Sequence, residues 1–214
     1  MPNKNKTAEN RSYIFDIRSE QREDGISTLS GQPIVYSSPT DIGGWFREII
    51  EPGALDGADM KDVPLLVNHD NRMIPVARSR NNNANSTMRL MITDTGLNFE
   101  ADIDVERNAT ARELQSAVDR RDLDGMSFAF WVSGERWEDL DTDYPTRYIT
   151  KFERIAEISA VTWPAYEATS IYARSKEALE SARSSLESAR QRSAESLESD
   201  LELAKAKFNF NSKL

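Results

Sequence analysis

Short β-rich segments, each closed within a few residues by glycine, proline, asparagine, aspartate or serine, make up most of the sequence between Tyr13 and Tyr172. Branched and aromatic residues favour strands, and the residues between the segments favour turns. Because such strands must bury one face, the pattern predicts a closed or strongly bent sheet. The expected strands are YIFDIRS (13–19), QPIVYSS (32–38), WFREII (45–50), VPLLVNH (63–69), STMRLMITD (86–94), GLNFEADID (96–104), MSFAFWVSGERWE (126–138), RYITKFERI (147–155) and EISAVTWPA (157–165).

The turns and helices between these strands are also indicated by the sequence. GISTLSG (25–31) is typical of a turn region, and the sequence from Asp94 to Gly96 is typical of a hairpin turn. One helix is predicted at about 108–121, with Asn108 as its N-cap and with a single apolar face made by Ala111, Leu114, Ala117 and Val118. The expected fold class is therefore mainly β with flanking helices, an α+β arrangement.

The two ends of the chain differ from this central region. Residues 1–10 are rich in asparagine and lysine and are expected to be disordered. From Arg174 to Phe208 the sequence contains no glycine or proline, which predicts a long helix within residues 174–214. Its apolar seam is narrow and rich in alanine, so we expect a coiled coil or a helix docked on a partner. The seam consists of Leu179, Ala182, Leu186, Ala189, Leu197 and Leu201.

Composition excludes several classes of function. The 214 residues carry a formal net charge of −9, which disfavours a generic nucleic-acid-binding surface. The chain has no cysteine, so disulfides, thiolate catalysis and cysteine-ligated zinc are excluded. A single histidine makes a zinc hydrolase a poor alternative, and no cofactor is expected. The sequence contains no apolar run of about 18 residues, the length that would predict a membrane span. The N-terminus is polar and lacks the apolar stretch of a signal peptide, so we expect a cytosolic protein.

Three polar residues stand in apolar surroundings and could carry chemistry. His69, the only histidine, follows the strand-like VPLLVN; Ser127 lies in DGMSFAFWV; and Glu157 opens the apolar EISAV. Each has an ordinary explanation. A lone histidine is more often a surface or core residue, the serine could be a small filler in a buried strand, and the glutamate could face water at a strand end. The individual residues therefore leave their roles open.

Five blocks taken in order resemble the prohead proteases of tailed bacteriophages, the capsid-maturation serine proteases. The resemblance covers roughly residues 12–173, and its blocks are GGWFREIIEPGAL, LLVNHDNRMIPVARS, MRLMITDTGLNFEADI, ARELQSAVDRRDLDGMSFAF and IAEISAVTWPAYEATS. It implies a herpesvirus-protease-like β-barrel flanked by helices. It also implies Ser127 as the nucleophile, His69 as the general base and Glu157 as the third member of the triad. Residues 11–173 would form the protease domain, and the helical tail at 174–214 would be a processed extension.

The same resemblance implies a function and its partners. We expect a serine endopeptidase that acts inside the immature capsid, or prohead, in the host cytoplasm. Its substrates would be the major capsid protein or the scaffold protein, and the chain itself. Self-association through the barrel or the tail is a further expectation, with neither nucleic acid nor membrane as partner. A catalytically idle, protease-like scaffolding protein is the alternative, because acidic helical tails suit assembly roles.

Two details of the site stay open at the level of sequence. Asp70 is adjacent to His69 and competes with Glu157 as the orienting acid, although consecutive residues on a strand point to opposite faces. In the distant herpesvirus relatives, arginines shortly after the third triad member stabilise the oxyanion. Here no arginine follows Glu157 before Arg174, so backbone N–H groups are the default expectation for that role.

Overall fold

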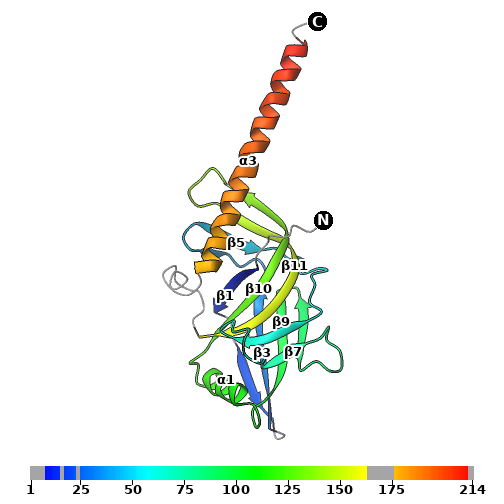
Figure 1. The fold of residues 1–214 in the computed structure, drawn as a ribbon, viewed down its shortest axis with the longest axis vertical. Helices are drawn as coiled ribbons and strands as arrows, with labels where there is room; N and C mark the ends of the chain where they lie inside the picture. Colours follow the sequence, from blue (N-terminus) through cyan, green and yellow to red (C-terminus); the bar gives the residue numbers. More distant parts are fainter. Residues whose placement is uncertain (1–7, 15–16, 23–24, 163–175, 212–214) are drawn as a thin grey trace.

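The structure is a computed structural model that describes residues 8–14, 17–22, 25–162 and 176–211. Its strands form two sheets, a short helix lies at one end of them, and a long helix extends from the other end (Figure 1). The expected class, mainly β with flanking helices, is confirmed in this described part of the chain. None of its helices is long and apolar enough to span a membrane.

The larger sheet has seven strands and is organised around one long hairpin. Its main path runs β1-β10-β11-β5-β4, and β6 pairs with the far end of β11 and with β7. Both β5 and β6 pair in parallel with β11: β5 pairs with its N-terminal part, and β6 pairs with its C-terminal part. The strands are β1 (Glu9–Ile14), β4 (Thr40–Ile42), β5 (Phe46–Ile50), β6 (Val63–Val67), β7 (Ala77–Ser79), β10 (Gly125–Glu138) and β11 (Thr146–Val161).

The smaller sheet has four antiparallel strands and corrects one sequence-based prediction. Its order is β2 (Arg18–Gln21), β3 (Ile26–Val35), β9 (Gly96–Asp104) and β8 (Met88–Thr93). The predicted turn at 25–31 is wrong, because β3 runs through it with Ser27 and Leu29 fully buried. A register shift between Gly31 and Ile34 accommodates the irregular centre of the strand. The predicted β8–β9 hairpin is confirmed by the pairing of Thr93 with Gly96.

The expected closed barrel is not found in the described residues. No ladder joins the two sheets there, and at one meeting point Thr87 N donates a hydrogen bond to Arg78 O at 3.0 Å. Curvature comes instead from the β10–β11 hairpin, where register shifts occur from Ala129 to Glu135. Such shifts bend a strand and increase its twist. The sheet is therefore strongly bent, which was the other arrangement that the short strands allowed.

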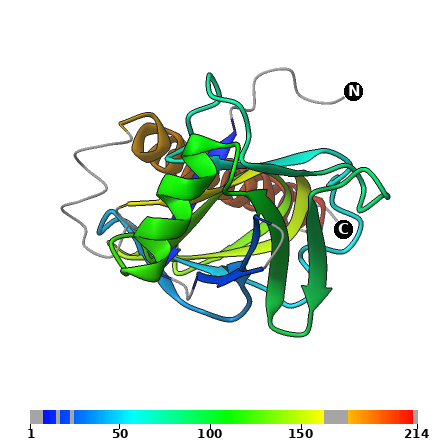
Figure 2. The same cartoon turned by 90° about the horizontal axis from the view of Figure 1, so that it is seen from below.

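Helix α1 (Ala109–Asp119) lies at the end of the sheets opposite the long helix, as the view from below shows (Figure 2). Its predicted cap is confirmed, because Asn108 Oδ1 accepts hydrogen bonds from the backbone N–H groups of Thr110 and Ala111. Ala111, Leu114 and Val118 are buried in the main core, which they share with residues of both sheets.

Helix α3 (Lys176–Asn211) divides into a docked part and a projecting part (Figure 1). Ala182, Leu186 and Ala189 of the predicted seam are buried, and a small apolar cluster joins Ala182 and Leu186 to Ile42 and Phe46. This part of the seam therefore packs on the body of its own chain. Further along, Leu197, Leu201 and Leu203 have exposed fractions of 69%, 55% and 57% in this single chain.

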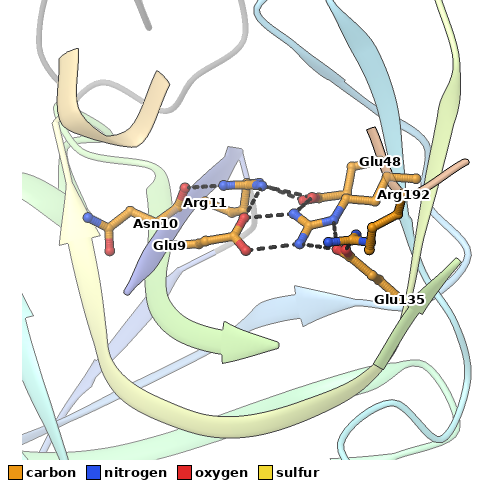
Figure 3. Close-up of polar contacts among 7 residues, drawn as sticks. Glu9, Asn10, Arg11, Glu48, Glu135 and Arg192 are labelled. Carbon is orange, nitrogen blue, oxygen red and sulfur yellow. Dashed lines mark hydrogen bonds and ion pairs between the residues drawn. The ribbon is translucent and has the colours of Figure 1, made fainter. Parts of the chain in front are cut away.

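A buried network of charges ties the N-terminal strand and α3 to the large sheet (Figure 3). Arg147, fully buried on β11, donates to Glu9 of β1 at 2.6 Å and to Glu48 of β5 at 2.9 Å. Arg11 donates to the same two carboxylates, at 2.8 Å to each. Glu9 lies within the segment that was expected to be disordered, and this pairing explains its order, because the four charged side chains of the network become buried together.

The network reaches α3 through Glu135 of β10. Arg147 approaches this carboxylate to 2.7 Å, and Arg192 of α3 donates to its other oxygen at 2.9 Å. Arg190 adds hydrogen bonds to the carbonyl oxygens of Leu140 and Thr142. Charge-assisted hydrogen bonds of this kind are directional, so they fix the position of the helix along the sheet as well as its attachment.

Glu9→Gln is expected to destabilise the protein by about 2–3 kcal/mol at pH 7, because it leaves a buried cluster short of one negative charge. Burial alone would raise the pKa of Glu9, but Arg147 and Arg11 outweigh burial and lower the pKa to about 2. The ionised carboxylate therefore stabilises the fold fully above about pH 4.5, and that contribution is lost as the pH falls toward 2.

Urea unfolding at pH 7 and at pH 3 tests this expectation. The difference between wild type and Glu9→Gln should be smaller at pH 3 than at pH 7. Glu138→Gln is the matched control, because its half-exposed pair with Arg136 should contribute at most about 1 kcal/mol. A difference for Glu9→Gln that is no larger than that of the control at pH 7 would contradict the stabilising role of the network.

Candidate active site

His69 lies just beyond β6 in a backbone turn that few side chains adopt. Asn68 and His69 have φ angles of 51° and 59°, in the left-handed region. Asparagine tolerates this region better than most residues, and its side chain here also binds the residue that follows β11: Oδ1 accepts hydrogen bonds from N and Oγ1 of Thr162, both at 3.1 Å. Asn68 N donates to Ala160 O at 2.9 Å. The turn is thus fastened to β11 and to the residue that follows it.

The structure brings His69 and Glu157 into direct contact. Nδ1 of the imidazole lies 2.6 Å from Oε1 of Glu157, and the two side chains are 28% and 11% exposed. Because an ionised carboxylate only accepts hydrogen bonds, the proton of a neutral ring belongs on Nδ1. Nε2 then carries the free lone pair, which is the arrangement that a general base requires.

Asp70, the competing acid, is engaged elsewhere. Its Oδ1 accepts hydrogen bonds from N and Nε of Arg72, both at 3.0 Å, and its Oδ2 accepts one from Nη2 at 3.2 Å. These bonds hold the pKa of Asp70 below its ordinary value. The carboxylate that lies against the imidazole is that of Glu157.

Ser127 lies on β10, fully buried, in register with Ser159 of β11. Residues directly opposite in an antiparallel pair place their Cβ atoms about 5 Å apart on the same face. Ser127 therefore stands beside the strand segment that carries Glu157. Its hydroxyl donates a hydrogen bond to the carbonyl oxygen of Arg11, on β1, at 2.7 Å.

Ser159 is a site residue that the sequence reasoning missed. Its Oγ donates to Oε2 of Glu157 at 2.6 Å, and it accepts a hydrogen bond from the backbone N–H of His69 at 3.2 Å. One signal was available in the sequence: Glu157 and Ser159 are two residues apart on a predicted strand and so share a face. That signal does not tell which other strand they meet.

The described residues contain no group of three or more histidine, cysteine, aspartate or glutamate side chains arranged to hold a metal ion. The chemistry available to His69, Glu157 and Ser127 is proton transfer and nucleophilic attack. Both operate with an imidazole, a carboxylate and a hydroxyl alone.

Comparison with known proteins gives one result. No curated protein and no solved structure matches the chain significantly. A family model described as Caudovirus prohead serine protease matches residues 14–183, which is most of the chain and includes both sheets almost entirely. The chain therefore belongs to the Caudovirus prohead serine protease family, whose members are serine peptidases of phage capsid maturation.

Proposed function

We propose that the protein is a serine endopeptidase in which Ser127 is the nucleophile, His69 the general base and Glu157 the acid that orients the imidazole. The observation that carries this proposal is the 2.6 Å contact between Nδ1 of His69 and Oε1 of Glu157. The chain has one histidine, and it is paired with a largely buried carboxylate beside the strand that carries Ser127. An imidazole in this setting can accept a proton and return it.

The reaction uses these residues in sequence. His69 takes the hydroxyl proton at Nε2 as Ser127 Oγ attacks the peptide carbonyl carbon. The tetrahedral intermediate then expels the amine, which takes that proton from His69, and an acyl-enzyme remains. Water, deprotonated by His69, attacks the ester, and the proton returns to Ser127 Oγ as the acid product leaves. Glu157 holds the ring in one tautomer and stabilises the imidazolium at each transfer.

Ser127 must change its hydrogen bond before this reaction can begin. Its hydroxyl proton is directed at Arg11 O, and the residue has no exposed surface. A rotation about the Cα–Cβ bond would turn the hydroxyl away from β1 when substrate binds. The same observation favours a second candidate, an idle protease-like module that serves in assembly through α3, because a serine that stayed buried in this way could not meet a substrate.

Labelling with a fluorophosphonate separates these two candidates. The active protease should become covalently labelled, with the adduct located on Ser127 by peptide mass spectrometry, and His69→Ala should lose the label. The idle module would remain unlabelled at every concentration of protein and probe. Ser133, which is exposed on the same strand, is the internal control for nonspecific reaction with serine hydroxyls.

The substrates we propose are the major capsid protein or the scaffold protein inside the prohead, together with the chain itself. Membership of the family supports the first two. Self-cleavage is proposed between about residues 165 and 214, where residues 165–175 lie outside the described part of the structure. Wild-type protein incubated at high concentration with the capsid precursor should give truncated masses of both chains, and Ser127→Ala should give neither.

A further inference from the structure

Ser159 connects the two residues on which the proposed chemistry depends. Its hydroxyl donates to Oε2 of Glu157 at 2.6 Å, and the same oxygen accepts from the backbone N–H of His69 at 3.2 Å. Ser159 is fully buried, so no solvent competes for either bond. A hydroxyl has one proton and two lone pairs. Here the proton is donated to the Glu157 carboxylate, and a lone pair accepts the hydrogen bond from the His69 backbone.

The first bond fixes the plane of the Glu157 carboxylate. One carboxylate oxygen contacts His69 Nδ1, and the other contacts Ser159. If the serine hydroxyl were removed, Oε2 would be left in a nearly buried position without this donor. The carboxylate could then regain a hydrogen bond by rotating, at the expense of its contact with the imidazole.

The second bond supports the unusual backbone of His69. A non-glycine residue with a φ of 59° lies in a sterically unfavourable region and is held there by its surroundings. Ser159 supplies the acceptor for the His69 N–H. The side chain of Asn68, the preceding residue, accepts a hydrogen bond from the backbone N–H of Thr162. Backbone and side chain of His69 are therefore anchored to the same strand, β11, within five residues of Glu157.

We propose that Ser159 is a positioning residue for the protease reaction: its hydroxyl holds the Glu157 carboxylate and the His69 backbone in the relative position that keeps the imidazole proton on Nδ1. This inference rests on the proposed function for its kinetic consequences. Its structural part, the control of the imidazole tautomer, holds whether or not the protein cleaves a given substrate.

Ser159→Ala is expected to lower kcat by about 10- to 100-fold with KM nearly unchanged, because the base is misaligned while the substrate-binding surface is intact. Ser159→Thr keeps a hydroxyl and should recover most of that loss. Ser27→Ala is the matched control, since Ser27 is also fully buried but lies in the smaller sheet and donates to Glu20 O. It should leave kcat within about twofold of the wild-type value.

The single histidine allows a second readout that does not depend on activity. In protein labelled with ¹⁵N-histidine, the ring nitrogen shifts above the pH of ring protonation report one imidazole and give its tautomer directly. Wild type, Ser27→Ala and Ser159→Thr should show the Nδ1–H form, and Ser159→Ala should show a mixture of both tautomers.

The kinetic measurement and the tautomer measurement test different parts of the proposal. A Ser159→Ala protein with an unchanged tautomer and an unchanged kcat would overturn the positioning role. If wild type shows no cleavage and no fluorophosphonate labelling, the proposed function fails, and the tautomer of Ser159→Ala still decides the structural inference. A parallel loss of kcat in Ser27→Ala would assign the effect to general loss of a buried hydroxyl, which also overturns the proposal.

Discussion

Replacement of Ser127, the proposed nucleophile, by alanine is expected to lower cleavage of the proposed substrate, the capsid precursor, by at least about 10³-fold and to leave the protein folded. Without Oγ there is no atom to form the acyl-enzyme, and His69 can only assist a slow direct attack by water. The variant loses the buried hydrogen bond to Arg11 O, at a cost of about 1 kcal/mol. The β-sheet circular dichroism and the urea midpoint should therefore stay close to those of wild type.

The measurement is kcat/KM on a peptide that spans a cleavage site identified with wild type. Ser133→Ala is the control on the same strand, and its exposed hydroxyl should be dispensable. A Ser127→Ala protein that retains more than about a tenth of wild-type kcat/KM would exclude this residue as the nucleophile, because loss of a nucleophile has much larger effects.

Glu157→Gln is expected to lower kcat by about 10²- to 10⁴-fold with little change in KM. The amide has nearly the shape of the carboxylate, so it can remain between His69 and Ser159. It lacks the negative charge that stabilises the imidazolium, and its NH₂ group can favour the wrong tautomer. Because the side chain is only 11% exposed, the charge acts with less screening than it would at the surface.

Asp70→Asn is the matched comparison, because it makes the same chemical change in the residue next to His69, the proposed base. It should lower kcat by at most about tenfold, through the local field alone, since the Asp70 carboxylate is bound by Arg72. Steady-state kinetics of both variants on one peptide decide between the acids. If Asp70→Asn has the larger effect, Asp70 is the orienting residue and Glu157 has a structural role on β11.

Much of the fold was readable from local patterns. The α1 cap at Asn108 and the hairpin between Thr93 and Gly96 depend on residues close in sequence, and both predictions are confirmed. The errors arose where distant residues decide the outcome. β3 begins directly after Gly25 and continues through Gly31 because it pairs with β9 and buries Ser27 and Leu29, and no local preference reports that partner.

The candidate site also combines features that the sequence indicated with features that depend on distant residues. Resemblance to the family assigned His69, Ser127 and Glu157, and the structure adds which atoms of His69 and Glu157 meet. The bond from Ser127 to Arg11 and the two bonds of Ser159 could not be predicted, because they depend on strand register. A shift of one residue in β10 against β11 would turn Ser127 to the other face.

The attachment of α3 means that cutting the chain and releasing the helix are separate events. Buried contacts of Ala182, Leu186 and Ala189, with the ion pair between Arg192 and Glu135, would persist after a backbone break on the N-terminal side of the helix. Before a cut, the helix is an intramolecular ligand at a high effective concentration. Afterwards it is a separate peptide whose occupancy depends on dilution, so a nicked enzyme in a small enclosed volume would keep its helix bound, and the same enzyme in free solution would lose it.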